Sequence, residues 1–203
     1  ENSDVFKECI GWALANEERF KIVDEAYIRG VSSRISASIT ESTLHGCPPD
    51  EIERIATYLI TEKNLNTYIK LNPTLLGYDY ARARLDSLGF DYVAFDDHHF
   101  KEDLQWEDAV PMLERLTALA AEKGVEFGVK LTNTFAVKAD RGELPDGNIY
   151  MSGRALLPLS LRVVARLRMD FGNTLPMSYC GGANAKNIVM LRGMGLFPVT
   201  VCT

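Results

Sequence analysis

Phe127-Gly128-Val129-Lys130-Leu131-Thr132-Asn133-Thr134 is an apolar run that ends in polar residues, which predicts a buried β-strand followed by a ligand-facing loop. Two further runs have the same design: residues 68–73 carry Lys70, and residues 176–182 end in Gly181-Gly182. In an all-parallel sheet built from βα units, ligands bind at the carboxyl ends of the strands. The repeated pattern therefore predicts an active-site edge and favours an enzyme.

Strand-like and helical segments alternate along the chain after an amphipathic helical stretch over residues 4–29. The expected strands are Ile35–Thr40, Thr67–Asn72, Tyr92–Phe95, Glu126–Thr132, Met177–Tyr179 and Pro198–Cys202. The expected helices begin near Asp50 and then cover Asp79–Leu88, Trp106–Lys123, Ala155–Met169 and Asn184–Met194, with glycine after four of them. Strands joined by helices of this length require right-handed parallel crossovers.

No GxGxxG or GxxxxGKS motif follows a strand, which favours a barrel over an open doubly wound sheet. The predicted fold is α/β: a partial (β/α)₈ TIM barrel in residues 35–203, containing the C-terminal strands of the barrel, after a helical segment in residues 1–34. Because the sequence ends on a predicted strand, we expect a fragment of a longer polypeptide. Unpaired barrel edges in such a fragment would favour a homodimer.

Composition excludes some classes of protein. The net charge is −6, from 22 basic and 28 acidic residues without long runs of either sign, so no nucleic-acid partner is expected. No apolar stretch approaches the ~20 residues that span a bilayer, so no membrane partner is expected either. The four cysteines lack a zinc or CxxC spacing, which indicates reduced thiols and a cytoplasmic protein.

Cys47 lies in a loop between an expected strand and an expected helix. A helix N-terminus lowers the pKa of a thiol, so Cys47 is a candidate general acid or base, with an inert loop cysteine as the alternative. His45 could orient this thiol or bind an anion, and the alternative is a solvated loop histidine.

Lys70 and Lys130 stand within apolar runs, where a lysine is costly unless it meets an anion or a cofactor. Each could contact a flavin ring or form a Schiff base, or could only extend its ammonium group to solvent. Gly181-Gly182 and Ser152-Gly153 precede helices and could offer backbone amides to a phosphate, although a tight turn explains a glycine pair equally well.

Asp96-Asp97-His98-His99 has the residue types of a metal site. Neighbouring residues on an extended chain point in opposite directions, so at most two could share one ion. A solvated turn is the favoured interpretation, and no metal site is predicted.

A set of motifs resembles the flavin barrel of dihydroorotate and dihydropyrimidine dehydrogenases, and more closely the selenate reductase subunit family. The motifs are His-Gly-Cys-Pro (45–48), Lys-Leu-Asn-Pro-Thr (70–74), Thr-Asn-Thr (132–134), Ser-Gly (152–153), Cys-Gly-Gly (180–182) and Val-Cys-Thr (201–203). The resemblance runs from Ser42 to Thr203, about four fifths of the chain. Members are long proteins in which iron–sulfur, flavin and pyridine-nucleotide parts follow the barrel.

The resemblance implies a flavin-dependent oxidoreductase with FMN in the full-length protein. It implies these roles: catalytic, Cys47; substrate-binding, Asn72, Asn133 and Thr134; cofactor-binding, Lys70 at the flavin ring and Gly153, Gly181, Gly182, Cys202 and Thr203 around the phosphate. The implied partners are a small-molecule substrate and other domains or subunits of a redox complex. Without the opening strands of the barrel, the isolated fragment is expected to hold no FMN.

Two features depart from the family pattern. Leu44 stands where those dehydrogenases have an asparagine, and an additional βα unit covers residues 92–123. Either that unit is an insertion, or Phe95-Asp96-Asp97 takes the Thr-Asn-Thr position and Lys130 is new. Two other functions compete with the flavin enzyme: a lyase or aldolase-type barrel with a Schiff base on Lys70 or Lys130, and a cofactor-free docking domain of a multi-subunit oxidoreductase.

Overall fold

The computed structural model describes residues 3–34, 36–139, 142 and 148–201. The chain divides into two compact units, residues 1–37 and residues 38–203. The first unit contains α1 (Asp4–Ala15), the short 3₁₀ helix η1 (Glu17–Arg19) and α2 (Glu25–Gly30). The expected continuous helix over residues 4–29 is interrupted, because the Asp24 side chain accepts a hydrogen bond from the Tyr27 amide (2.8 Å) and caps a new helix.

The second unit is built on a parallel sheet of four strands in the order β1 (Ser38–Glu41), β2 (Asn66–Leu71), β3 (Phe127–Leu131) and β6 (Met177–Tyr179). Their spatial order follows the chain without reversal, as in a barrel, whereas a doubly wound sheet reverses at its switch point. Lys70 is opposite Lys130 and Lys130 is opposite Ser178 in the register. The predicted α/β fold with a partial barrel is confirmed.

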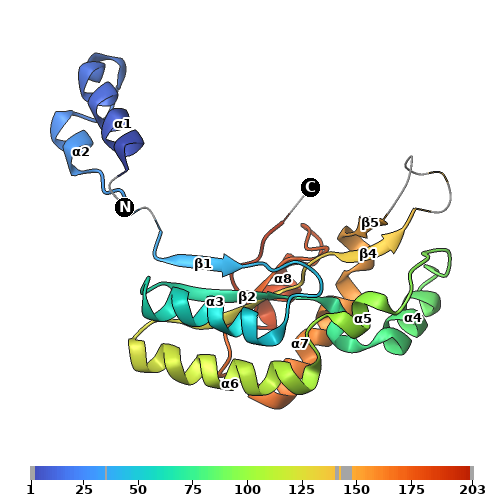
Figure 1. The fold of residues 1–203 in the computed structure, drawn as a ribbon. Coiled ribbons are helices and arrows are strands. Elements are labelled where there is room, and N and C mark those ends of the chain that lie inside the picture. Colours follow the sequence, from blue (N-terminus) through green and yellow to red (C-terminus); the bar gives the residue numbers. More distant parts are fainter. Residues whose placement is uncertain (1–2, 35, 140–141, 143–147, 202–203) are drawn as a thin grey trace. The chain divides into compact units, whose positions relative to one another are not determined.

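Helices cover one face of this sheet, as Figure 1 shows for α3 (Pro49–Thr61) and α6 (Trp106–Lys123). The other helices are α4 (Tyr78–Ser87), α5 (His98–Glu102), α7 (Leu157–Phe171) and α8 (Ile188–Gly193), with 3₁₀ turns η2 (Pro73–Leu76) and η3 (Gly153–Ala155). Alternate strand residues such as Ile69, Leu71 and Val129 are buried in the core. Each fully buried side chain of this size contributes about 1.5–3 kcal/mol. The intervening Lys70 and Lys130 are only half-buried.

The expected strand at Tyr92–Phe95 is not formed. β2 pairs directly with β3, so no strand lies between them. The carbonyl group of Val93 accepts a hydrogen bond from the Arg82 guanidinium instead (2.6 Å), as does that of Phe90 just before the segment (3.1 Å). The segment therefore lies outside the sheet, and Thr132-Asn133-Thr134 follows the strand beside Lys70.

The last expected strand, Pro198–Cys202, is represented by an isolated parallel bridge between Tyr179 and Val199. Residues 202–203 lie outside the described part of the chain. Between β3 and α7 the chain forms an antiparallel hairpin of β4 (Phe135–Lys138) and β5 (Asn148–Met151). In Figure 1 this hairpin lies at the end of the sheet toward which the β1 arrow points.

Candidate functional site

A cavity of about 590 Å³ opens at the carboxyl ends of β2, β3 and β6. We call it the glycine cavity, and it is lined by Lys70, Lys130, Thr132, Thr134, Ser152, Gly153, Leu156, Cys180, Gly181, Gly182, Ala183 and Thr200. Four predicted cofactor-binding residues (Lys70, Gly153, Gly181 and Gly182) and the predicted substrate-binding Thr134 are brought together here. Cys202 and Thr203 lie outside the described residues.

Two lysines place positive charge at one wall of the glycine cavity. Lys70 and Lys130 are neighbours in the β2–β3 register, so their side chains leave the same face of the sheet. Burial raises the pKa of the nearby Cys180 thiol, and the positive charges of Lys70 and Lys130 oppose that rise. A pair of cations beside an apolar wall favours an anionic ligand.

Close packing at the glycine turn explains why residue 182 has no side chain, and the turn leaves two backbone amide groups available to a ligand. Gly182 has φ +79°, and a Cβ there would lie 2.5 Å from the Gly153 carbonyl oxygen, so a side chain is excluded. The amide groups of Gly181 and Gly182 donate no hydrogen bond to any residue that the structure describes. Successive unbonded amides with such backbone angles form a concavity that suits an anion.

A second, smaller pocket adjoins the cavity, because Lys70 lines both. We call it the thiol pocket, and it is lined by Thr43, Leu44, Cys47, Ile52, Ile69, Lys70, Leu71, Asn72, Asp103 and Leu104. The predicted catalytic Cys47 and the predicted substrate-binding Asn72 therefore meet Lys70 here. Leu44, which departs from the family pattern, lies in the same wall.

The thiol of Cys47 differs from the expectation of a lowered pKa. Burial raises the pKa, and the carboxylates of Glu51 and Glu41 raise it further, while a hydrogen bond with Thr43 acts in the opposite direction. Sequence reasoning considered the N-terminus of α3 alone. Burial of the thiol has the largest effect, and the acidic side chains around the loop raise the pKa in the same direction.

The remaining predicted substrate-binding residues lie at the same edge of the sheet with different contacts. The Asn72 side-chain amide donates to an Asp103 carboxylate oxygen (3.0 Å). The Asn133 backbone amide donates to the Leu71 carbonyl (2.7 Å), and its side-chain oxygen accepts from the Thr134 amide (3.2 Å). Asn133 is not among the residues that line the glycine cavity.

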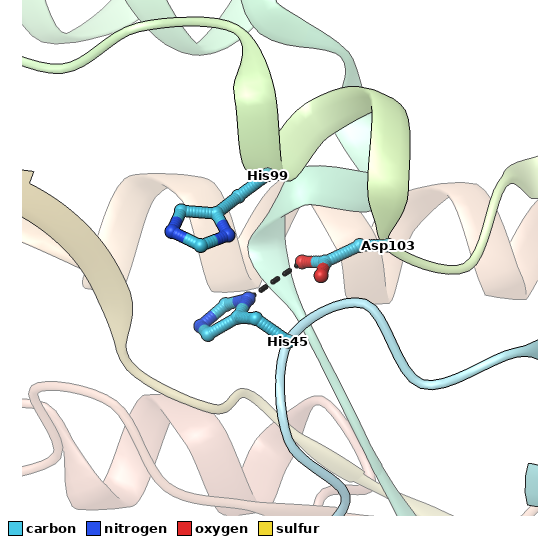
Figure 2. A group of neighbouring side chains, drawn as sticks. All are labelled: His45, His99 and Asp103. Carbon is cyan, nitrogen blue, oxygen red and sulfur yellow. Dashed lines mark hydrogen bonds and ion pairs between the residues drawn. The ribbon is translucent and has the colours of Figure 1, made fainter.

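Asp103 is the centre of a buried hydrogen-bond network that the sequence did not reveal. Its Oδ2 accepts from His45 Nδ1 (2.7 Å), Thr74 Oγ1 (2.6 Å) and Asn72 Nδ2 (3.0 Å), and its Oδ1 accepts from the Gly46 amide (2.8 Å). Burial raises the pKa of this carboxyl group, but the hydrogen bonds outweigh burial and hold the pKa below its usual value. Figure 2 shows the His45–Asp103 bond.

His45 and His99 meet at this network. The interpretation of His45 as a solvated loop residue is wrong, because its side chain is only 11 % exposed. The His99 ring lies 4.8 Å from the His45 ring, and burial lowers the pKa of His99 with a further contribution from His45. Asp96 and Asp97, by contrast, form exposed ion pairs with Lys138 (2.9 Å) and Lys101 (2.6 Å).

Glu41, the last residue of β1, is a further group that sequence reasoning missed. Its side chain is buried, and neither carboxylate oxygen has a hydrogen-bond partner among the described residues. Burial raises the pKa of Glu41 to about 7.

The sheet order and the strand-end cavity define a domain of the TIM-barrel class with a site suited to an anion. The chain matches the family described as "Oxidoreductase YgfK, N-terminal TIM-barrel domain" over residues 1–203, and it belongs to this family. It is 48% identical over 180 residues to "Putative oxidoreductase YgfK" of Escherichia coli strain K12, and equally to the protein of that name from Escherichia coli O157:H7. The aligned part covers 87% of this chain but 17% of each relative.

The chain is therefore a barrel domain that forms part of an oxidoreductase, and it spans about a sixth of the curated relatives that it matches. Within the described residues, no helix is long and apolar enough to cross a membrane.

Proposed function

We propose that this chain is the cofactor- and substrate-binding barrel domain of a flavin-dependent oxidoreductase, with FMN in the glycine cavity. The observation that carries the proposal is the meeting of two lysines with two unbonded glycine amides in one cavity at the strand ends. Ligand pockets commonly measure about 300–1,000 Å³, so the volume of about 590 Å³ suits a ligand of this size.

The charges and donors fit the two polar ends of the cofactor. The amides of Gly181 and Gly182, beside Gly153, would hold the phosphate, because amide groups without partners bind an anion at little cost. Lys70 would contact the electron-rich ring, and Cys202 and Thr203 would extend the phosphate cradle. The flavin, when bound, supplies reversible acceptance of two electrons.

A small unsaturated heterocycle would lie in the open cavity of about 590 Å³ that Ser42, Leu44 and Cys47 help to line, because the thiol pocket itself has room for about one water molecule. Cys47 is assigned the transfer of a proton with the substrate carbon, because it shares the thiol pocket with Lys70 and Asn72. Asn72, Asn133 and Thr134 would orient the substrate through their amide and hydroxyl groups. Further domains or subunits of the redox complex would exchange electrons with the cofactor.

The test is the FMN content of the full-length protein and of two lysine variants. Flavin is released by denaturation and identified by chromatography. Lys70→Met should reduce bound FMN at least about tenfold, which corresponds to about 1.4 kcal/mol. The matched control is Lys101→Met, because Lys101 is an exposed lysine paired with Asp97 on α5. Equal FMN content in the two variants would contradict the proposal, since any flavin would then be bound elsewhere.

One observation favours a second candidate, a Schiff-base barrel. Lys70 and Lys130 are adjacent in the register and line the same cavity, so either amine is placed to attack a carbonyl compound bound there. Borohydride trapping of a carbonyl compound on either lysine, located by peptide mass spectrometry, would support this candidate. A full-length protein without flavin or adduct, but in stable association with a redox partner, would indicate a docking domain.

A further inference from the structure

The imidazole of His45 is held in one orientation by a fixed acceptor. Asp103 is 1% exposed in its side chain, and its carboxylate is secured by Gly46, Thr74 and Asn72 as well as by His45. Because an ionised carboxylate can only accept, Nδ1 of His45 carries the proton in this bond. In the neutral ring, the lone pair is therefore on Nε2.

That lone pair has no partner. Nε2 of His45 is buried, and no described residue donates a hydrogen bond to it. An unsatisfied buried polar atom costs about 1–3 kcal/mol, so such atoms in a folded protein call for an explanation by a water, an ion or a function.

A second imidazole faces the first across a short gap. His99 and Asp103 lie one helical turn apart at α5, and the Asp103 amide donates to the His99 carbonyl (3.0 Å). The rings of His45 and His99 are tilted by 43° with centroids 4.8 Å apart. Figure 2 shows both rings beside Asp103, with the unbonded nitrogen of His45 on the side away from the carboxylate.

We propose that His45 and His99 bind one divalent transition-metal ion of the zinc class, with Asp103 as the positioning residue that orients His45. One donor atom from each of the three residues lies within 4.8 Å of the other two. Zinc–nitrogen bonds of about 2.0–2.1 Å in tetrahedral geometry separate two ligands by about 3.3 Å, so the two rings must turn toward one another to bind the ion.

The donor types select the metal. Imidazole nitrogens suit zinc, cobalt, nickel and copper, whereas magnesium and calcium prefer oxygen ligands. A histidine that binds a metal through one nitrogen typically donates its other N–H to a carboxylate, and the His45–Asp103 bond has this arrangement. Water or a small-molecule ligand would complete the coordination. The inference is independent of the flavin proposal, because His45 and His99 do not line the glycine cavity.

The experiment measures Zn²⁺ binding by isothermal titration calorimetry with metal-depleted full-length protein. The variants are His45→Asn and His99→Asn, and the matched control is His98→Asn. His98 is an exposed histidine next to His99 on the same helix. Each test variant should lose one equivalent of Zn²⁺ relative to the wild type, while the control should retain it. Mg²⁺ should not compete.

Equal Zn²⁺ stoichiometry in the wild type and both test variants would overturn the proposal, as would loss of the ion in the control. Circular dichroism checks that each variant is folded. If His45→Asn does not fold, His99→Asn decides alone, because it leaves the His45–Asp103 bond intact. Co²⁺ gives a second readout: a visible absorption band should form in the wild type and the control but not in His99→Asn.

Discussion

Asp103 joins three segments that are distant in the sequence. Its carboxylate accepts hydrogen bonds from the loop after β1 through His45 and Gly46, and from the turn after β2 through Thr74. The position of the Cys47 loop over the strand ends therefore depends on one buried side chain. Removing the carboxylate leaves several donors without an acceptor in a place that water reaches poorly.

We predict that Asp103→Ala lowers the free energy of unfolding by about 3 kcal/mol or more, since each buried donor left without an acceptor costs about 1–3 kcal/mol. The measurement is urea unfolding followed by circular dichroism. Asp91→Ala is the control, because Asp91 is exposed. A change below about 1 kcal/mol for Asp103→Ala would show that the network does not hold the loop.

Glu41 should make stability depend on pH in a defined direction. Its pKa is raised from 4.5 to about 7 in the folded protein, so between these values the folded state holds a proton that the unfolded state has lost. The contribution of Glu41 to stability is full below about pH 4.5 and is lost as the pH rises through 7. A shift of this size corresponds to about 3 kcal/mol.

Glu41→Gln removes this dependence. The free energy of unfolding of the variant minus that of the wild type should increase by about 3 kcal/mol from pH 4.5 to pH 8. Urea unfolding at a series of pH values measures it, with the exposed Glu114→Gln as control. A difference that stays flat over this range would mean that Glu41 has an acceptor or donor in solution that the structure does not describe.

At the scale of elements, β2 and β3 meet closely at Gly128. A Cβ at this position would lie 2.6 Å from the Pro176 carbonyl oxygen and 2.6 Å from Cε1 of Tyr68. Tyr68 is opposite Gly128 in the register. The missing side chain lets the tyrosine ring lie across the sheet on the face that carries Lys70 and Lys130.

We expect Gly128→Ala to destabilise the sheet by about 1–3 kcal/mol, the usual cost of overpacking. Gly193→Ala in α8 is the matched control, because no atom lies within 4 Å of a Cβ there. Thermal unfolding of both variants gives the comparison. If Gly128→Ala unfolds at the same temperature as the wild type, the close contact between β2 and β3 relaxes without a cost in stability.

The whole molecule shows which sequence signals are reliable. The bounds of α6 and the strands around Lys70 and Lys130 were predictable, because their apolar periodicity is local and their partners follow in chain order. Tyr92–Phe95 has the same apolar character, but its aromatic ring at Phe95 packs on Phe100 and Phe135 and not in a sheet. A short apolar run does not by itself show whether a segment forms a strand of the sheet or packs against the core without one.

The candidate site was predictable only in part. Strand-end residues such as Lys70 and Gly181 follow from a general rule for parallel sheets, and they do line one cavity. The His45–Asp103 pair joins residues 58 positions apart, and no spacing in the sequence indicates it. The pKa of Cys47 likewise depends on Glu41, whose burial became known only from the folded chain.

The central claim is that the glycine cavity holds FMN, and a crystal structure of the full-length protein with its flavin tests it most directly. The account predicts a flavin phosphate that accepts hydrogen bonds from the amides of Gly181 and Gly182, with the ring against Lys70. An empty glycine cavity in a crystal whose flavin is fully occupied elsewhere in the chain would contradict it.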